Sequence, residues 1–271
     1  MKNIFVLLLV ALSFTSFAQE KIEELEQYEI RSYAPQKSGV KDLVFEARID
    51  NLTDILQKNL SLGKLSDVSF KVYWLSPSQY QIEVHGLPKG FQEVKADLIQ
   101  LIKGKLEFVL PESFSEKFKG YNLKAEPVAD GKLIRAIDQT YTMAVPEVNI
   151  LMDKAGALKS VETRAPMSVV KTEFFHSPKS WSNGKLVLDK IVLNTSQGAV
   201  KITSTNDIEY QNVNGIGFPS KITIKNVAEG KVPATAKEKE KTVKNESGTI
   251  IRFSKYEVNT GKAQRYIDAK K

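Results

Sequence analysis

The chain has 271 residues, a formal net charge of +7 and no cysteine. The lack of cysteine excludes disulfides, thiolate metal sites and a cysteine nucleophile. Lysines are frequent but form no long basic block, and the sequence contains no recognition helix or basic stripe interleaved with aromatic residues. We therefore expect no binding to nucleic acid.

Residues 1–18 have the pattern of a secretory signal. Lys2 precedes an apolar run over Ile4–Phe14, and Ser16–Ala18 has the small-x-small form that signal peptidase prefers. The run is shorter than the roughly 20 residues of a membrane span, although it could instead be retained as an interfacial anchor. We expect cleavage after Ala18 and one exported domain over Gln19–Lys271. With no cysteine to carry a lipid, this domain should be soluble, not lipidated and periplasmic.

The first half of the chain alternates predicted helices with strands. Apolar residues at three- and four-residue spacing predict amphipathic helices over Glu20–Tyr33, Asn51–Leu62 and Phe91–Ile102. Leu43–Asp50 alternates apolar and polar residues, which predicts a strand between the first two helices.

Val68–His85 is the clearest structural signal in the sequence. Apolar and polar residues alternate on both sides of a break at Pro77, which is the signature of an antiparallel hairpin. Successive side chains of a strand point to opposite faces, so one face of this ribbon carries aromatic and aliphatic residues together. That face must be covered, either by the protein itself or by a ligand.

From Tyr121 onward the sequence predicts mainly strands, each bounded by Gly, Asn, Ser or Pro. The polar segment 228–248 is expected to be a mobile loop or the tip of a hairpin, and the tail Ala263–Lys271 is expected to fray. The predicted strands, together with a short one after the third helix, are Lys105–Leu110, Leu123–Val128, Lys132–Asp138, Val148–Asp153, Ala157–Arg164, Met167–Phe175, Lys185–Leu193, Ala199–Thr205, Lys221–Val227 and Thr249–Val258.

These elements predict a mainly β protein with a few helices, in the α+β class. Many short strands joined by regular turns indicate a large curved antiparallel sheet or an unclosed β-barrel. The amphipathic helices, which are concentrated in the first half of the chain, would cover its concave face.

No motif in the sequence demands catalysis, a cofactor or a metal. The two histidines, His85 and His176, lie at separate strand ends without ligand-spaced neighbours, and we expect them at the surface or the rim. A carboxylate pair for glycoside hydrolysis remains an open alternative, because such a pair needs only to be close in space. The carboxylates that could face inward are Glu162, Glu173, Asp189 and Glu209.

The concave side of such a sheet is either filled by the protein's own side chains or left as a cavity. Apolar residues of the hairpin and of the third helix would face one another across this space. The candidate lining residues for a lipid are Phe70, Val72, Trp74, Tyr80, Ile82, Val84, Leu98 and Leu101.

The hairpin also carries a family resemblance. The run V-Y-W-L-S-P-S-Q-Y-Q-I-E-V over Val72–Val84 resembles the aromatic strand, Pro turn and second strand of the periplasmic lipoprotein carriers of the LolA/LolB type. The segment Ile208–Ile224 is similar to a later strand pair of outer-membrane lipoprotein-sorting relatives. Ser76 stands where the best-known carriers have an arginine. The resemblance implies an unclosed barrel whose helices form a lid over a hydrophobic cavity for acyl chains.

The expected function is therefore non-catalytic binding and carriage of a lipid, a lipoprotein acyl chain or another amphiphile. Its partners would be the lipid or acylated protein and, transiently, a membrane or an envelope protein. The alternatives are an exported envelope module with a filled core and a carbohydrate-active hydrolase.

Overall fold

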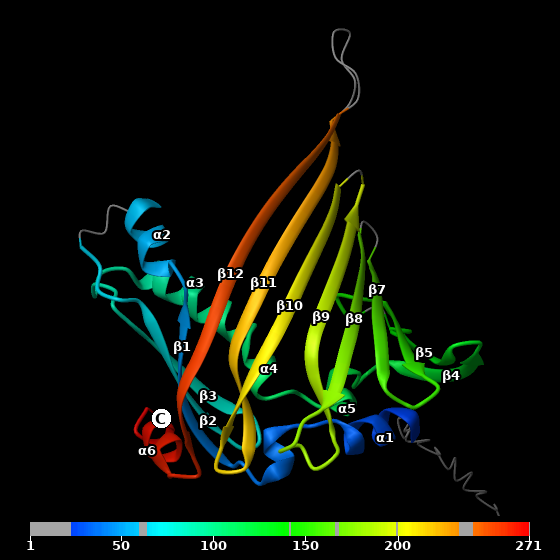
Figure 1. Cartoon of the computed structure of the whole chain (residues 1–271), viewed down its shortest axis with the longest axis horizontal. Coiled ribbons are helices and arrows are strands. Elements are labelled where there is room, and N and C mark those ends of the chain that lie inside the picture. The colour runs from blue at the N-terminus through cyan, green and yellow to red at the C-terminus, as the bar shows by residue number, and fades with distance from the viewer. Residues whose placement is uncertain are drawn as a thin grey trace, which may run out of the picture.

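One antiparallel sheet organises the whole molecule (Figure 1). The structure is a computed structural model, and it describes residues 23–59, 64–140, 142–165, 168–198, 200–232 and 241–270. The strands are β1 (Asp42–Ile49), β2 (Ser69–Leu75), β3 (Gln79–His85), β4 (Asn122–Val128), β5 (Gly131–Ile137), β6 (Glu147–Asp153), β7 (Leu158–Ala165), β8 (Ser168–Pro178), β9 (Leu186–Gln197), β10 (Val200–Val213), β11 (Ile216–Val232) and β12 (Lys241–Val258).

The strand order shows why the sheet stays open. β4 to β12 follow one another as a meander, and β12 then pairs with β1, which continues through β2 to the edge strand β3. The twelve strands thus run β3-β2-β1-β12-β11-β10-β9-β8-β7-β6-β5-β4, and the two edges, β3 and β4, do not pair with each other. The predicted class, a mainly β α+β protein with an unclosed curved sheet, is confirmed.

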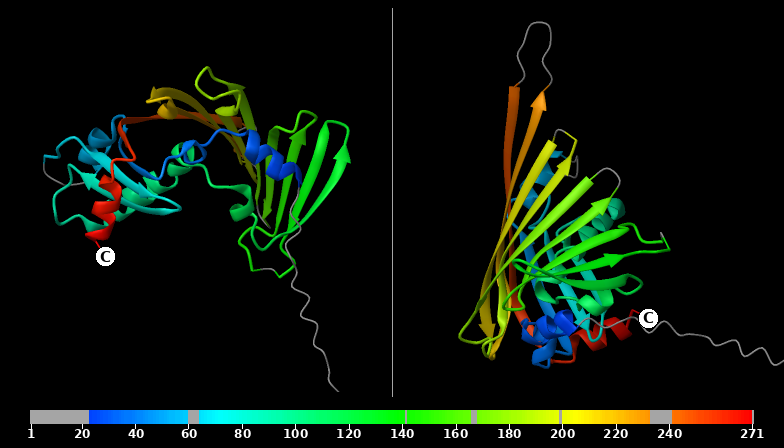
Figure 2. Two further views of the ribbon diagram at one scale, coloured as in Figure 1. Left: turned by 90° about the horizontal axis from the view of Figure 1, so that it is seen from below. Right: turned by 90° about the vertical axis from the view of Figure 1, so that its right-hand side faces the viewer.

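Most of the helices lie within the curve of the sheet (Figure 2). The exceptions are α2, at one end of β1, and α6, on the outer face of β1 and β2. The helices are α1 (Glu23–Arg31), the 3-10 turn η1 (Pro35–Ser38), α2 (Leu52–Asn59), α3 (Gln92–Lys103), α4 (Leu106–Val109), α5 (Phe114–Lys117) and α6 (Lys262–Asp268).

Two predictions for individual elements were wrong. Lys105–Leu110 is the short helix α4 and not a strand, because Gly104 keeps a right-handed helical conformation and the chain turns on directly after α3. Leu106 and Val109 then both point into the core.

The tail Ala263–Lys271 was expected to fray, but its residues up to Asp268 belong to the helix α6. Tyr266 stacks on Tyr73 with ring centroids 3.8 Å apart, and the backbone N–H of Gln264 donates a 2.9 Å hydrogen bond to the Asp42 carboxylate. These partners lie on β1 and β2, far from the tail in the sequence. The sequence of the tail alone therefore does not predict the contact.

The polar segment 228–248 extends two strands outward. Its described parts are the distal ends of β11 and β12, which pair from Ala228 opposite Asn245 to Val232 opposite Lys241. Glu229 lies opposite Lys244, a cross-strand pairing of opposite charges that suits an exposed ribbon. Residues 233–240, at the predicted tip, and residues 1–18, the predicted signal, lie outside the described residues.

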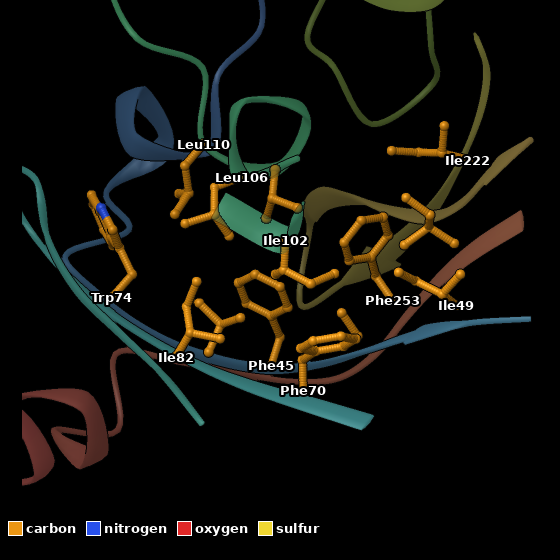
Figure 3. Close-up of a cluster of buried hydrophobic side chains, with 14 of the residues drawn as sticks. Phe45, Ile49, Phe70, Trp74, Ile82, Ile102, Leu106, Leu110, Ile222 and Phe253 are labelled. Carbon is orange, nitrogen blue, oxygen red and sulfur yellow. The ribbon is translucent and has the colours of Figure 1, made fainter. Parts of the chain in front are cut away.

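Two hydrophobic cores lie within the curve. The α3 core is formed by α3, α4 and the inner faces of β1–β3 and β10–β12, and its fully buried members include Phe45, Phe70, Ile102 and Ile222 (Figure 3). The α1 core is formed by α1, β4–β7 and Phe118, with Ile134 and Ile150 fully buried. The middle strands of the sheet connect the two cores.

Candidate functional site on the inner face of the sheet

The hairpin residues predicted to line a cavity lie close together, but other side chains of the protein fill the space between them. Phe70, Val72, Trp74, Ile82 and Leu98 are all at most 8% exposed in the α3 core, and Tyr80 and Val84 pack against its side. Figure 3 shows Ile102, Leu106 and Leu110 pointing toward Phe45, Phe70 and Ile82. Leu101 does not join them, because it is 44% exposed on α3. Seven of the eight predicted residues therefore gather in one filled core.

Two shallow hollows lie at the surface. One, of about 500 Å³, is lined by charged residues that include Arg48, Asp67 and Arg252, and it reaches Ile49 and Leu52 at the margin of the α3 core. The other, of about 480 Å³, lies between α1 and the ends of β5 and β6 and is lined by residues that include Glu24 and Lys132. In the first hollow Arg48 pairs with Asp67, and in the second Lys132 pairs with Glu24. Neither hollow is lined by a residue predicted to bind lipid.

A different part of the inner face is left open by the helices. The distal halves of β8–β12 extend beyond the helices in Figure 1, and the strand register sorts their inward side chains into three rows. We call these rows the open strip. In order from β8 to β12 they are Phe174–Ile191–Asn206–Ile224–Thr249, then Thr172–Leu193–Ser204–Asn226–Ser247, then Val170–Thr195–Ile202–Ala228–Asn245.

Exposure increases along the open strip from the first row to the third. Asn206 and Ile224, in the first row, are 4% and 8% exposed, because they border the α3 core. In the third row Ile202 is 41% exposed, and Val200, one step further along β10, is 43% exposed. The inner face thus becomes exposed as it leaves the packed core, and no element among the described residues covers its third row.

The charged side chains of these strands are absent from the three inward rows. The three rows contain aliphatic, aromatic, amide and hydroxyl side chains but no charged one. The positions between them point to the outer face, where Lys171 pairs with Glu173 and Lys244 pairs with Glu246. A face left to bulk water would be expected to carry charged residues as well. The open strip does not have the composition of an ordinary solvated surface.

An aromatic cluster closes the lower end of the inner face. Trp181, in the loop between β8 and β9, packs against Tyr33 and Tyr210 with ring centroids 4.9 and 5.6 Å away. The Tyr33 hydroxyl accepts a 2.7 Å hydrogen bond from the Gly217 amide. A Cβ on Gly217 would stand 2.1 Å from the Trp181 ring, so this position requires glycine.

A histidine and a tyrosine join α1 to the middle of the sheet. The Tyr28 hydroxyl lies 3.0 Å from Nε2 of His176, and the two rings meet edge to face. Burial lowers the pKa of His176 below its usual value and raises the pKa of Tyr28. His176 is half-buried at this contact between α1 and β8. His85 is the more open one, with 53% of its side chain exposed.

The carboxylates considered for hydrolysis do not meet on the inner face. Glu162 and Glu173 lie on the outer side of β7 and β8, where they pair with Arg164 and Lys171. Glu209 pairs with Lys221 and is 62% exposed at its side chain. Asp189, near the start of β9, pairs with Lys179 of the preceding loop.

No protein-family model, curated protein or solved structure matches this chain. Among the described residues, no helix combines the length and apolar character needed to cross a membrane. The same residues hold no group of three or more His, Cys, Asp or Glu side chains placed to bind a metal ion.

The open strip could not be located from the sequence, although its alternation was visible there. Val200 and Ile202 alternate with Lys201 and Thr203, which marks one face of a strand. The alternation does not say which rows the helices cover. That depends on the strand register and on where α4 and η1 contact β11.

Proposed function

We propose that this protein binds an acyl chain or a related amphiphile on the inner face of its unclosed sheet, without catalysing a reaction. The observation that carries the proposal is the absence of charge from the open strip, which is curved and partly aliphatic and whose second and third rows are left open by the described helices. Exposed apolar surface costs about 25 cal/mol per Å² relative to burial. A hydrocarbon chain that covers Leu193 and Ile202 would remove this cost.

The proposed binding place differs from the one expected from the sequence. The hairpin and α3 are packed together, so the hairpin would act as a fixed wall, and the ligand would lie on the strands beyond it. We also propose that residues 1–18 direct export to the periplasm. There the cargo would be a lipid or an acylated protein, handed over in transient contact with a membrane or an envelope protein.

The filled α3 core specifically favours one alternative, an exported envelope module that binds no lipid. In that case the side chains of Phe70 and Trp74 serve only to stabilise the fold, since both are almost completely buried by protein. The two functions differ in whether hydrocarbon occupies the open strip.

Lipid extraction tests the proposed function. Protein purified without detergent is extracted into chloroform and methanol, and the extract is analysed by mass spectrometry. In parallel, the delipidated protein is titrated with N-phenyl-1-naphthylamine, a neutral fluorescent apolar probe. We expect a co-purifying acyl lipid, probe binding, and displacement of the probe when that lipid is added back. Absence of both lipid and probe binding would overturn the proposal in favour of the envelope module.

A further inference from the structure

The open strip is divided from side to side. Over β8 and β9 its side chains are mostly apolar, and the first two rows carry Phe174, Ile191 and Leu193 there. Over β10–β12 the same two rows carry amides and hydroxyls around the buried Ile224: Asn206, Ser204, Asn226, Ser247 and Thr249. We call these five residues the polar patch. An apolar half and an uncharged polar half thus lie side by side on one continuous surface.

The chemistry of the polar patch selects for neutral groups. Asparagine offers an amide that donates and a carbonyl that accepts, and serine and threonine do both through one hydroxyl. These groups can satisfy the hydrogen bonds of an uncharged partner, but they supply no counter-charge. The charged side chains of the same strands, such as Lys225 and Glu229, point to the outer face. A charged head group on the polar patch would be partly desolvated without an ion pair, which is unfavourable.

The dimensions of the apolar half suit a chain that lies along the strands. Residues on one face repeat about every 6.8 Å along a strand, so the three rows extend over about 14 Å. Val170, in the third row of β8, continues the apolar half away from the core. A hydrocarbon chain lying along β8 and β9 with its head group at the core-side end would reach the polar patch when the head group turns toward β10.

The shape of the sheet argues against a second copy of the chain as the occupant. The face is concave in Figure 2, and two concave faces placed against each other curve apart and touch only at their rims. The polar patch, moreover, lies in the first two rows, close to the α3 core, where Asn206 is only 4% exposed. Asn206 itself is closed by the core, and the members of the patch that a ligand can contact are Ser204, Asn226, Ser247 and Thr249, which are partly or fully exposed.

We propose that the ligand joins a hydrocarbon chain to an uncharged hydrogen-bonding head group, as a monoacylglycerol does. The chain lies over β8 and β9, and the head group hydrogen-bonds with the polar patch on β10–β12. This assignment rests on the proposed lipid-binding function and adds to it the charge and the placement of the head group.

Three probes with the same twelve-carbon chain test the assignment: dodecanoylglycerol, dodecanoate and dodecyltrimethylammonium. Each is titrated below its micellar concentration against the delipidated full chain, and displacement of N-phenyl-1-naphthylamine is measured. We expect the neutral glyceride to bind at least about tenfold more tightly than either ion, because burying an unpaired charge is costly. Equal or tighter binding of an ion would overturn the assignment and leave lipid binding intact. Failure of all three probes, and of the fluorescent probe itself, would instead overturn the proposed function.

A matched pair of variants tests the placement of the head group. Asn226→Asp puts a negative charge in the polar patch, whereas Asn194→Asp puts the same charge on the outer face of β9 and keeps the oxygen that accepts from Thr203. We expect Asn226→Asp to weaken dodecanoylglycerol binding about tenfold and to bring dodecyltrimethylammonium, a cation, to at least equal affinity. Asn194→Asp should leave both affinities unchanged. If the two variants behave alike, or if Asn226→Asp does not alter the preference between the probes, the placement is wrong. Melting curves identify a variant that fails to fold, and Asn226→Leu, which should weaken glyceride binding without attracting the cation, then replaces Asn226→Asp.

Discussion

The two halves of the inner face share the same alternating strand pattern but differ in whether helices cover them. On β1 and β2 every inward residue of the α3 core is apolar, and α3 and α4 cover them (Figure 3). On the distal halves of β8–β12 the inward residues alternate with outward ones in the same way, yet no described helix lies over the second and third rows (Figure 1). The difference lies in composition. The covered half is wholly apolar, whereas the open half mixes aliphatic side chains with amides and hydroxyls. The alternation thus defines the inner face, and the composition separates a filled core from an uncharged surface that the described helices leave open.

Truncation of one large side chain in each half should show this difference most strongly. Phe70→Ala removes a fully buried ring from the α3 core and should lower the free energy of unfolding by about 3–5 kcal/mol. Leu193→Ala in the open strip removes a partly exposed side chain and should cost about 1 kcal/mol or less. Urea denaturation of the delipidated proteins measures both. A loss of several kcal/mol for Leu193→Ala would show that the strip is part of a core and would contradict the comparison.

A smaller change, in the pH dependence of stability, is expected from the contact between α1 and the sheet. Burial lowers the pKa of His176, whose ordinary value is 6.5, so the unfolded chain takes up a proton at this residue at a higher pH than the folded chain. The stability of the wild-type protein should therefore fall as the pH drops below about 6.5. His176→Gln should flatten this part of the curve, as measured by urea midpoints between pH 5 and 7.5.

The variant Tyr28→Phe separates the two possible causes of this pH dependence. It removes the hydroxyl that lies 3.0 Å from Nε2 but keeps the ring that buries the imidazole. Because burial is the main cause of the lowered pKa, the pH dependence should survive in Tyr28→Phe. A wild-type curve that His176→Gln leaves unchanged would show that this histidine does not link pH to stability.

Local patterns in the sequence predicted most of the fold. The hairpin Val68–His85 became β2 and β3, and the helix predicted over Phe91–Ile102 is α3 with its ends shifted by one residue. Both depend on periodicity within one segment, which the sequence displays directly. Features that depend on distant partners were missed or misassigned. α6 needs Tyr73 and Asp42, and the place of Trp181 needs a glycine at position 217.

The candidate site was predicted only in part for the same reason. The sequence showed that the hairpin face had to be covered, and α3 and α4 cover it. Leu101 was counted with that face but lies 44% exposed, since its neighbour Ile102 takes the inward position on α3. The open strip forms from the mutual register of five strands, so its uncharged rows become visible only once Asn206, Asn226 and Ser204 are seen to be neighbours.

The most direct test of the account is to place one charge on either side of the same strand. Leu193 and Val192 are adjacent on β9, and their side chains point to the inner and the outer face. The delipidated variants Leu193→Glu and Val192→Glu are titrated with the neutral fluorescent probe, after urea denaturation has shown that both are folded. The account predicts that Leu193→Glu abolishes probe binding while Val192→Glu binds as the wild type does. Unchanged binding in Leu193→Glu, or equal loss in both variants, would contradict the assignment of the open strip as the binding surface.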